Sequence, residues 1–251
     1  MSDPGALFDL TGKVALVTGG SRGLGREMVL AFAAAGADVV IASRKLGNCE
    51  AVAAEVEAAT GRRALPVGCH VGHWEECDEL ADRAYGHFGA VDILVNNAGM
   101  SPLAPSAAET SEELFDKVIG VNFKGPFRLS ALIGQRMYDS GGGSIINVSS
   151  SGALFPAPRF GPYAGAKAAL NALTGVFARE YAPRVRVNTL SAGPFLTDIS
   201  RQWPPVGERT WRNAAGRAGE PEEVVTTALY LASAASSYTT GSLIRVDGGL
   251  Y

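Results

Sequence analysis

The chain has 251 residues, of which 47% are hydrophobic and 19% charged, and its formal net charge is −3. This composition suits a globular protein with one apolar core and excludes a disordered chain. The weak negative charge excludes a strongly basic surface, so we expect no nucleic-acid partner.

No apolar run reaches the roughly 18 residues that a membrane-spanning helix requires, and the opening "MSDPGALFDL" lacks the basic and apolar regions of a secretory signal. We therefore expect a cytoplasmic protein that makes no membrane contact and acts on small molecules. The three cysteines form no C-x-x-C pair, and their odd number predicts reduced thiols.

Short apolar runs alternate with stretches of helical periodicity along the whole chain. The runs lie at residues 14–17, 38–43, 64–67, 91–95, 144–149, 185–190 and 242–246, and the helical stretches at 24–35, 46–59, 74–87, 111–137, 162–181 and 221–234. Strands that alternate with helices predict right-handed crossovers and a parallel sheet. We expect a single α/β domain over residues 1–251, with a Rossmann-like doubly wound parallel seven-stranded sheet and helices on both faces. Residues 195–221 are irregular, which is typical of a functional loop.

The first predicted strand runs directly into "TGGSRGLGR", which places Gly19, Gly23 and Gly25 just before an apolar helix. Glycines let backbone N–H groups approach a pyrophosphate, which the positive end of the helix then stabilises. The spacing T-G-x-x-x-G-x-G differs from G-x-G-x-x-G and indicates another branch of the dinucleotide-binding fold. Ser21 and Leu24 lie in the same turn.

The residues after the second strand predict which cofactor is bound. An acidic side chain about 20 residues beyond the glycine turn bonds the ribose of NAD. This chain instead has Ser43, Arg44 and Lys45 there, and Arg22 in the turn adds a second guanidinium. Arginine matches phosphate in shape and charge, so the pattern favours NADP over NAD. The alternative interpretation is that these cations are ordinary solvated charges.

One cluster contains zinc-ligating residue types: Cys69, His70, His73 and Cys77. Their spacing matches no common zinc pattern. We interpret the cluster as the end of a strand followed by the start of a helix, and we expect no metal.

Tyr163 and Lys167 in "YAGAK" lie four residues apart, so they share one face of a helix. A nearby ammonium should lower the pKa of the phenol and suit it to general acid–base catalysis. Upstream, Ser150 in "INVSSS" is our candidate to bond a substrate oxygen, with Ser149 and Ser151 as alternatives. Asn122 has a side-chain amide that could carry a water toward the lysine.

These motifs, in this order, resemble the short-chain dehydrogenase/reductase family, and the resemblance covers essentially the whole chain: "TGGSRGLG", "NNAG", "VIGVNFKG", the serine, "YAGAK", "SAGPFLT" and "GSLIRVDGG". It implies a tetrad of Asn122, Ser150, Tyr163 and Lys167, in which Tyr163 exchanges a proton with the substrate while hydride moves to or from nicotinamide. Family members are commonly tetramers, so we expect a homo-oligomer, a tetramer or a dimer. The cofactor-binding residues that we expect are Gly19, Ser21, Arg22, Gly23, Leu24, Gly25, Ser43, Arg44, Lys45, His70, Val71, Asn96, Ala98, Gly99, Tyr163, Lys167, Gly193 and Thr197.

The chain departs from the family pattern at two positions. His70 replaces the aspartate that bonds the adenine amino group, and imidazole can accept a hydrogen bond in one of its tautomers. Ala192 replaces a common proline, which should change the stiffness of the loop and leave the chemistry alone.

The sequence thus predicts an NADP(H)-dependent oxidoreductase that interconverts a carbonyl and a secondary alcohol. The alternative is a catalytically idle NADP(H)-binding sensor or scaffold. Ketones, keto sugars and 3-oxoacyl thioesters all stay open as substrates. Arg159 could hold an anionic substrate group or face solvent. The expected substrate contacts are Met100, Ser101, Phe195 and Trp203, with Phe155, Leu196 and Trp211 as further candidates.

Overall fold

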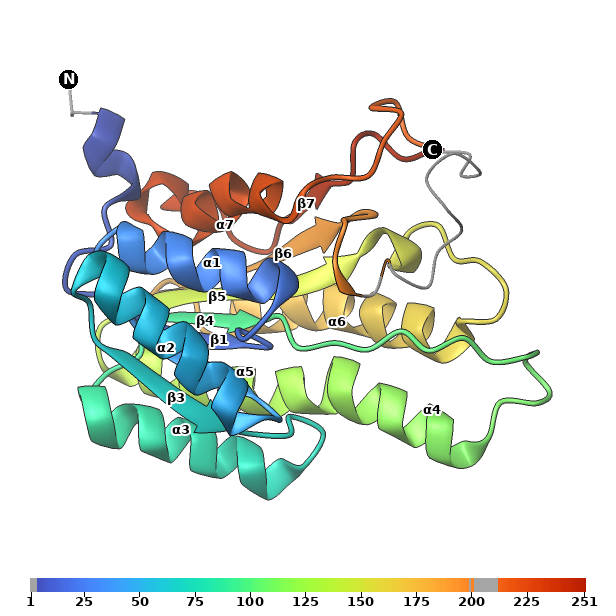
Figure 1. The fold of residues 1–251 in the computed structure, drawn as a ribbon, viewed down its shortest axis with the longest axis horizontal. Coiled ribbons are helices and arrows are strands. Elements are labelled where there is room, and N and C mark those ends of the chain that lie inside the picture. The colour runs from blue at the N-terminus through green and yellow to red at the C-terminus, as the bar shows by residue number, and fades with distance from the viewer. Residues whose placement is uncertain (1–3, 199, 201–211) are drawn as a thin grey trace.

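The fold is a seven-stranded, wholly parallel sheet, seen in a computed structural model that describes residues 4–198, 200 and 212–251 (Figure 1). The strand order is β3-β2-β1-β4-β5-β6-β7. The strands are β1 (Val14–Thr18), β2 (Asp38–Ser43), β3 (Ala64–Gly68), β4 (Ile93–Asn96), β5 (Gly143–Ser150), β6 (Val185–Ala192) and β7 (Leu243–Val246). This arrangement confirms the predicted sheet.

Helices cover both faces of the sheet. They are α1 (Gly23–Ala34), α2 (Leu46–Thr60), α3 (Trp74–Phe88), α4 (Glu112–Ile119), α5 (Gly125–Asp139), α6 (Gly161–Glu180) and α7 (Val225–Ala232). Short 3-10 turns lie at η1 (Pro4–Phe8), η3 (Ser151–Ala153), η6 (Pro221–Val224) and η7 (Ala234–Ser236). Helices α1, α2 and α7 pack on one face, and α3, α5 and α6 pack on the other. None of the described helices is long and apolar enough to cross a membrane.

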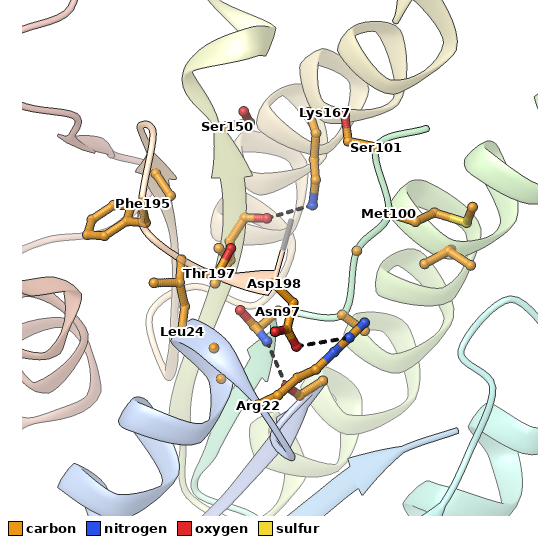
Figure 2. Close-up of a pocket in the computed structure, with 18 of the residues that line it drawn as sticks. Arg22, Leu24, Asn97, Met100, Ser101, Ser150, Lys167, Phe195, Thr197 and Asp198 are labelled. Atoms are coloured by element: carbon orange, nitrogen blue, oxygen red, sulfur yellow. Dashed lines mark hydrogen bonds and ion pairs between the residues drawn. The ribbon is translucent and has the colours of Figure 1, made fainter. Parts of the chain in front are cut away.

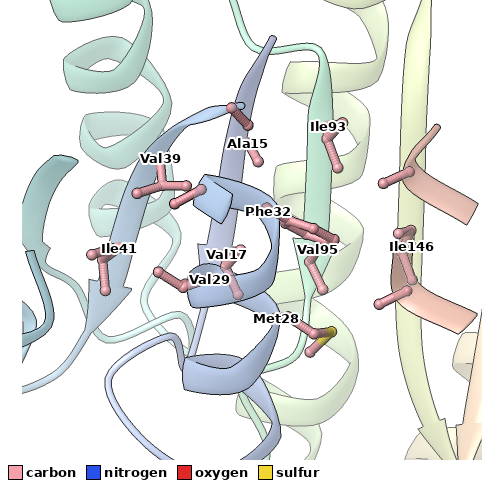
Figure 3. Packing of buried hydrophobic residues seen from close by; sticks show 14 of the residues in the cluster. Ala15, Val17, Met28, Val29, Phe32, Val39, Ile41, Ile93, Val95 and Ile146 are labelled. Carbon is pink, nitrogen blue, oxygen red and sulfur yellow. The ribbon is translucent and has the colours of Figure 1, made fainter. Parts of the chain in front are cut away.

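The core consists of two apolar layers separated by the sheet. In the layer beneath α1, Met28 and Phe32 lie against Val17 and Val95, all fully buried (Figure 3). Strands buried on both faces account for their continuous apolar runs.

The predicted helix over residues 111–137 differs from the structure, which has two helices joined by the π-helical turn η2 (Gly120–Lys124). The Asn122 amide donates to the Val118 carbonyl at 2.9 Å inside this turn. A Cβ added to Gly125 would lie 2.1 Å from the Val71 carbonyl oxygen. Gly125 therefore lets α5 begin directly against the backbone that follows β3.

The order of the strands reverses between β1 and β4 because the crossovers leave β1 in both directions. Ligands of open parallel sheets bind at such a switch point, outside the carboxyl ends of the strands. Part of the irregular segment closes over this edge: Leu196 donates its N–H to the Gly219 carbonyl, and Gly219 donates to that of Pro194.

Candidate active site

A cavity of about 740 Å³ opens at the carboxyl edge of the sheet beside the switch point (Figure 2). It gathers residues from the ends of β1, β2, β4, β5 and β6. The predicted residues that line it are Gly19, Ser21, Arg22, Gly23, Leu24, Gly25, Ser43, Arg44, Lys45, His70, Val71, Ala98, Gly99, Met100, Ser101, Ser149, Ser150, Ser151, Phe155, Tyr163, Lys167, Gly193, Phe195 and Thr197. Trp203 and Trp211 lie outside the described residues.

The glycine-rich turn fits a pyrophosphate. Helix α1 begins at Gly23 without a side-chain cap and without an acidic residue in its first turn, so its first N–H groups have no capping acceptor. A Cβ on Gly25 would lie 2.2 Å from the Gly19 carbonyl oxygen and 2.4 Å from the Asn97 amide nitrogen. Only glycine permits this close approach, which leaves the positive end of the helix open to an anion.

The charge of the cavity is opposite in sign to that of the chain. Five cations line it: Arg22, Arg44, Lys45, Lys117 and Lys167. Asp198 is the one carboxylate among the described lining residues, and it pairs with the Arg22 guanidinium at 3.2 Å. The Ser21 hydroxyl, which donates to Ser43 at 2.9 Å, ties the glycine turn to the end of β2. The cavity therefore attracts an anionic ligand.

Tyr163 and Ser150 meet at the end of β5. Their side chains share a hydrogen bond, and Ser150 also accepts the Gly152 N–H at 3.0 Å. The Ser149 hydroxyl instead donates to the backbone carbonyl of Lys167 at 3.3 Å. Of the three candidate serines, Ser150 is thus the one that bonds the phenol.

The prediction that the pKa of the Tyr163 phenol is lowered is wrong for the protein without a bound ligand. Burial raises the pKa of the phenol above its ordinary value, and the hydrogen bond with Ser150 only opposes that rise. Lys167 is 3% exposed, and its ammonium donates to the Val148 carbonyl at 2.7 Å (Figure 2). Burial lowers the pKa of Lys167 to about 8. Desolvation therefore sets the direction of both pKa shifts.

The two predicted asparagines make different contacts, and only Asn96 lies away from its predicted place. The Asn122 amide donates to the carbonyls of Met100 and Val118, each at 2.9 Å, so neither of its hydrogens is left to hold a water. Asn96 is buried and donates to Ser130 and Asn147, away from the cavity. Asn97 lines the cavity in its place and donates to the Thr18 carbonyl at 2.9 Å.

Apolar side chains line the cavity that holds the Ser150–Tyr163 pair. Phe160 packs edge-on against Tyr163 with ring centroids 6.2 Å apart, and Phe155 and Leu250 also line the cavity. Sequence reasoning missed Phe160, Leu250 and Lys117. None of these three residues belongs to a motif. Lys117 lies one helical turn before Val121, and this spacing could have indicated that the two side chains share a helix face.

Arg159 lies outside the cavity lining. Its side chain donates to the Ala104 carbonyl at 3.1 Å, and its backbone carbonyl accepts the Ala104 N–H at 2.9 Å. Its φ of 77° is in the left-handed region, which a bulky residue adopts only when the surroundings impose it. The residue thus fastens the loop after β4 to the loop before α6.

The residues of the zinc-like cluster make other contacts. The Cys69 thiol donates to the Glu76 carbonyl and the Cys77 thiol to that of Val71. His70 and His73 stack with ring centroids 4.3 Å apart. Within the described ranges no group of three or more such side chains is placed to hold a metal ion.

The parallel sheet, its switch point and the glycine turn define a Rossmann-like α/β protein whose cavity suits a dinucleotide. A sequence model of the short chain dehydrogenase family matches residues 13–206. The chain belongs to the short-chain dehydrogenase/reductase family. An uncharacterized oxidoreductase of Mycobacterium tuberculosis is 40% identical over 252 residues, covering 97% of this chain and 94% of the relative.

Solved structures agree with this assignment. The NADPH-dependent 3-quinuclidinone reductase from Rhodotorula rubra matches with a TM-score of 0.93 at 30% identity, covering 99% of this chain and 95% of that one. A 7α-hydroxysteroid dehydrogenase complexed with NADH and 7-oxo glycochenodeoxycholic acid matches with a TM-score of 0.93 at 30% identity, covering 100% and 98%.

Proposed function

We propose that this chain is an NADP(H)-dependent oxidoreductase that interconverts a carbonyl and a secondary alcohol, with Tyr163 as the general acid and base. The observation that carries the proposal is that Lys167 and the hydrogen-bonded pair of Tyr163 and Ser150 line the same cavity as an uncapped helix N-terminus and several further cations. A bound nicotinamide would supply or accept the hydride. The idle-sensor alternative leaves the Tyr163–Ser150 hydrogen bond in the cavity without a purpose.

Different residues would transfer the proton and orient the substrate oxygen. A raised pKa keeps the Tyr163 phenol protonated at neutral pH, so it can donate to a carbonyl oxygen. The Ser150 hydroxyl, bonded to that phenol, orients the same oxygen. Below about pH 8 the buried Lys167 ammonium is charged and stabilises the phenolate that forms.

The cations at the end of β2 support NADP(H) over NAD(H). Relatives of this fold include an NADPH-dependent enzyme and one complexed with NADH, so the preference has to come from this chain's own residues. Arg44 and Lys45 line the cavity beside Ser43, where an NAD-binding protein has a carboxylate. Arg22 lines the same cavity and would have to exchange Asp198 for a phosphate.

The apolar lining of the cavity favours a ketone with a hydrophobic carbon skeleton. Phe160 packs against Tyr163, Phe155 and Leu250 line the same cavity, and a pocket with such apolar lining gains affinity from apolar area. Cyclic ketones are therefore our first candidates, ahead of keto sugars and β-keto thioesters.

The test is a spectrophotometric screen of NADPH oxidation against these three substrate classes, together with titrations of NADPH and NADH. We expect turnover with at least one class, most readily a cyclic ketone, and tighter binding of NADPH. Tight NADPH binding without turnover across the panel would instead support the sensor, and tighter NADH binding would refute the cofactor preference.

A further inference from the structure

The cavity extends past the glycine turn toward β3, and its far end is lined by the residues that follow that strand. If the turn holds the pyrophosphate and the end of β2 the ribose, the base of the dinucleotide lies beyond β2, beside His70 and Val71. Val71 and Val121 are buried there and give the slot apolar walls. This placement rests on the proposed function.

His70 lines this slot, and its ring is held in one orientation. The Gly72 backbone N–H donates to His70 Nδ1 at 3.2 Å. The ring stacks on His73 at an interplanar angle of 19°. Glu76 accepts the His70 backbone N–H at 2.6 Å through one oxygen and contacts His73 Nδ1 at 2.5 Å through the other.

The contact with Gly72 fixes the tautomer of the ring. A backbone N–H can only donate, so Nδ1 must be the unprotonated nitrogen, and a neutral ring then carries its proton on Nε2. Burial, together with the neighbouring His73 and Arg44, lowers the pKa of His70, which favours the neutral ring. In the part of the chain that the structure describes, Nε2–H has no hydrogen-bond partner. The acceptor expected from the sequence is thus already used by the backbone.

We propose that His70 presents an N–H donor to the edge of the cofactor's purine and thereby sets which base the enzyme prefers. The 6-amino group of adenine is also a donor, so the two groups cannot bond. A purine with an oxygen at position 6 offers an acceptor. The slot therefore accepts a hypoxanthine dinucleotide at least as well as the adenine form, whereas an aspartate at this position would favour adenine.

The experiment compares the binding of NADPH and of its hypoxanthine analogue by fluorescence titration in wild type, His70→Asp and His70→Ala. His87→Asp is the matched control, because it makes the same change at an exposed residue outside the cavity. We expect wild type and H87D to bind the analogue at least as tightly as NADPH. The H70D variant should shift the ratio of the two dissociation constants about tenfold toward adenine, since a carboxylate accepts the amino hydrogen and repels an oxygen.

The H70A variant should shift the ratio in the same direction by a smaller factor, because it removes the donor without adding an acceptor. If both cofactors bind and their ratio is the same in wild type, H70D and H70A, the role of His70 is wrong and the proposed function stands. If wild type binds neither cofactor, the proposed function fails together with this inference.

Discussion

The pKa of Lys167 differs from what its position in the sequence suggests. Its place one turn after Tyr163 indicates a cation beside a phenol, but the sequence does not reveal that burial would weaken that cation. In the structure its amine lies in the core with the Val148 carbonyl as its acceptor, and burial lowers its pKa to about 8. The proposed tetrad follows from the motifs, whereas the electrostatics depend on packing from distant segments.

The buried lysine makes stability depend on pH. The folded pKa of about 8 is below the ordinary value of 10.5, so between these values the unfolded chain binds more protons and stability rises with pH. Lys167→Met removes the penalty for a buried charge. We expect this variant to be more stable than wild type by about 3 kcal/mol at pH 7, and by less than half of that at pH 9.5. Urea unfolding at both pH values measures this, and an advantage that is independent of pH contradicts it.

At the scale of elements, the strands and most helices could be predicted because their apolar patterns are local. The π turn after α4 could not, because helical periodicity continues through residues 111–137 and only the tertiary approach of Val71 shows why Gly125 is needed. Leu250 was missed for a similar reason: a chain end carries no local signal of the cavity that it reaches.

The approach of α5 to Val71 predicts a steric effect. Gly125→Ala places a methyl group 2.1 Å from the Val71 carbonyl oxygen and should destabilise the fold by about 2 kcal/mol or more. The control is Gly86→Ala in α3, where a Cβ meets nothing within 4 Å and alanine should stabilise by up to about 1 kcal/mol. Equal midpoints of thermal unfolding for the two variants would rule out the close contact.

We propose that the turn from β2 into α2 sets the cofactor preference. Arg44→Asp replaces a cation with the carboxylate typical of NAD-binding chains, so we expect NADPH binding to weaken about tenfold or more while NADH binding holds or improves. Arg83→Asp on α3 makes the same charge change outside the cavity lining and should alter neither constant. Isothermal titration measures both, and parallel losses for the two cofactors would contradict the assignment.

At the scale of the whole molecule, the chain is acidic overall, yet its cavity is basic. A net charge of −3 could be read from the sequence, but not the convergence of five cations on one cavity. Three large apolar side chains are exposed on helices of one face: Phe115 on α4, Phe127 on α5 and Val176 on α6. Exposed apolar groups of this kind suit an interface between copies of the chain.

We therefore expect a homo-oligomer that associates through α4, α5 and α6. Val176→Glu places a charge at a residue that is 52% exposed, so it should reduce the mass in solution while the helical signal is kept. Tyr238→Glu, at a fully exposed residue beyond α7, is the control and should keep the wild-type mass. Light scattering after gel filtration measures the mass of each variant in solution, and a monomeric wild type would refute the expected homo-oligomer.

The proposed chemistry depends most on the proton that Tyr163 donates, and Tyr163→Phe tests this directly. Tyr181→Phe is the matched control, because this second tyrosine follows the same helix and its hydroxyl donates to the Ala131 carbonyl, away from the cavity. With any substrate that wild type reduces, Y163F should lose turnover by about 10²-fold or more at unchanged NADPH affinity, while Y181F keeps its activity. Comparable turnover in Y163F and wild type would contradict the proposed chemistry.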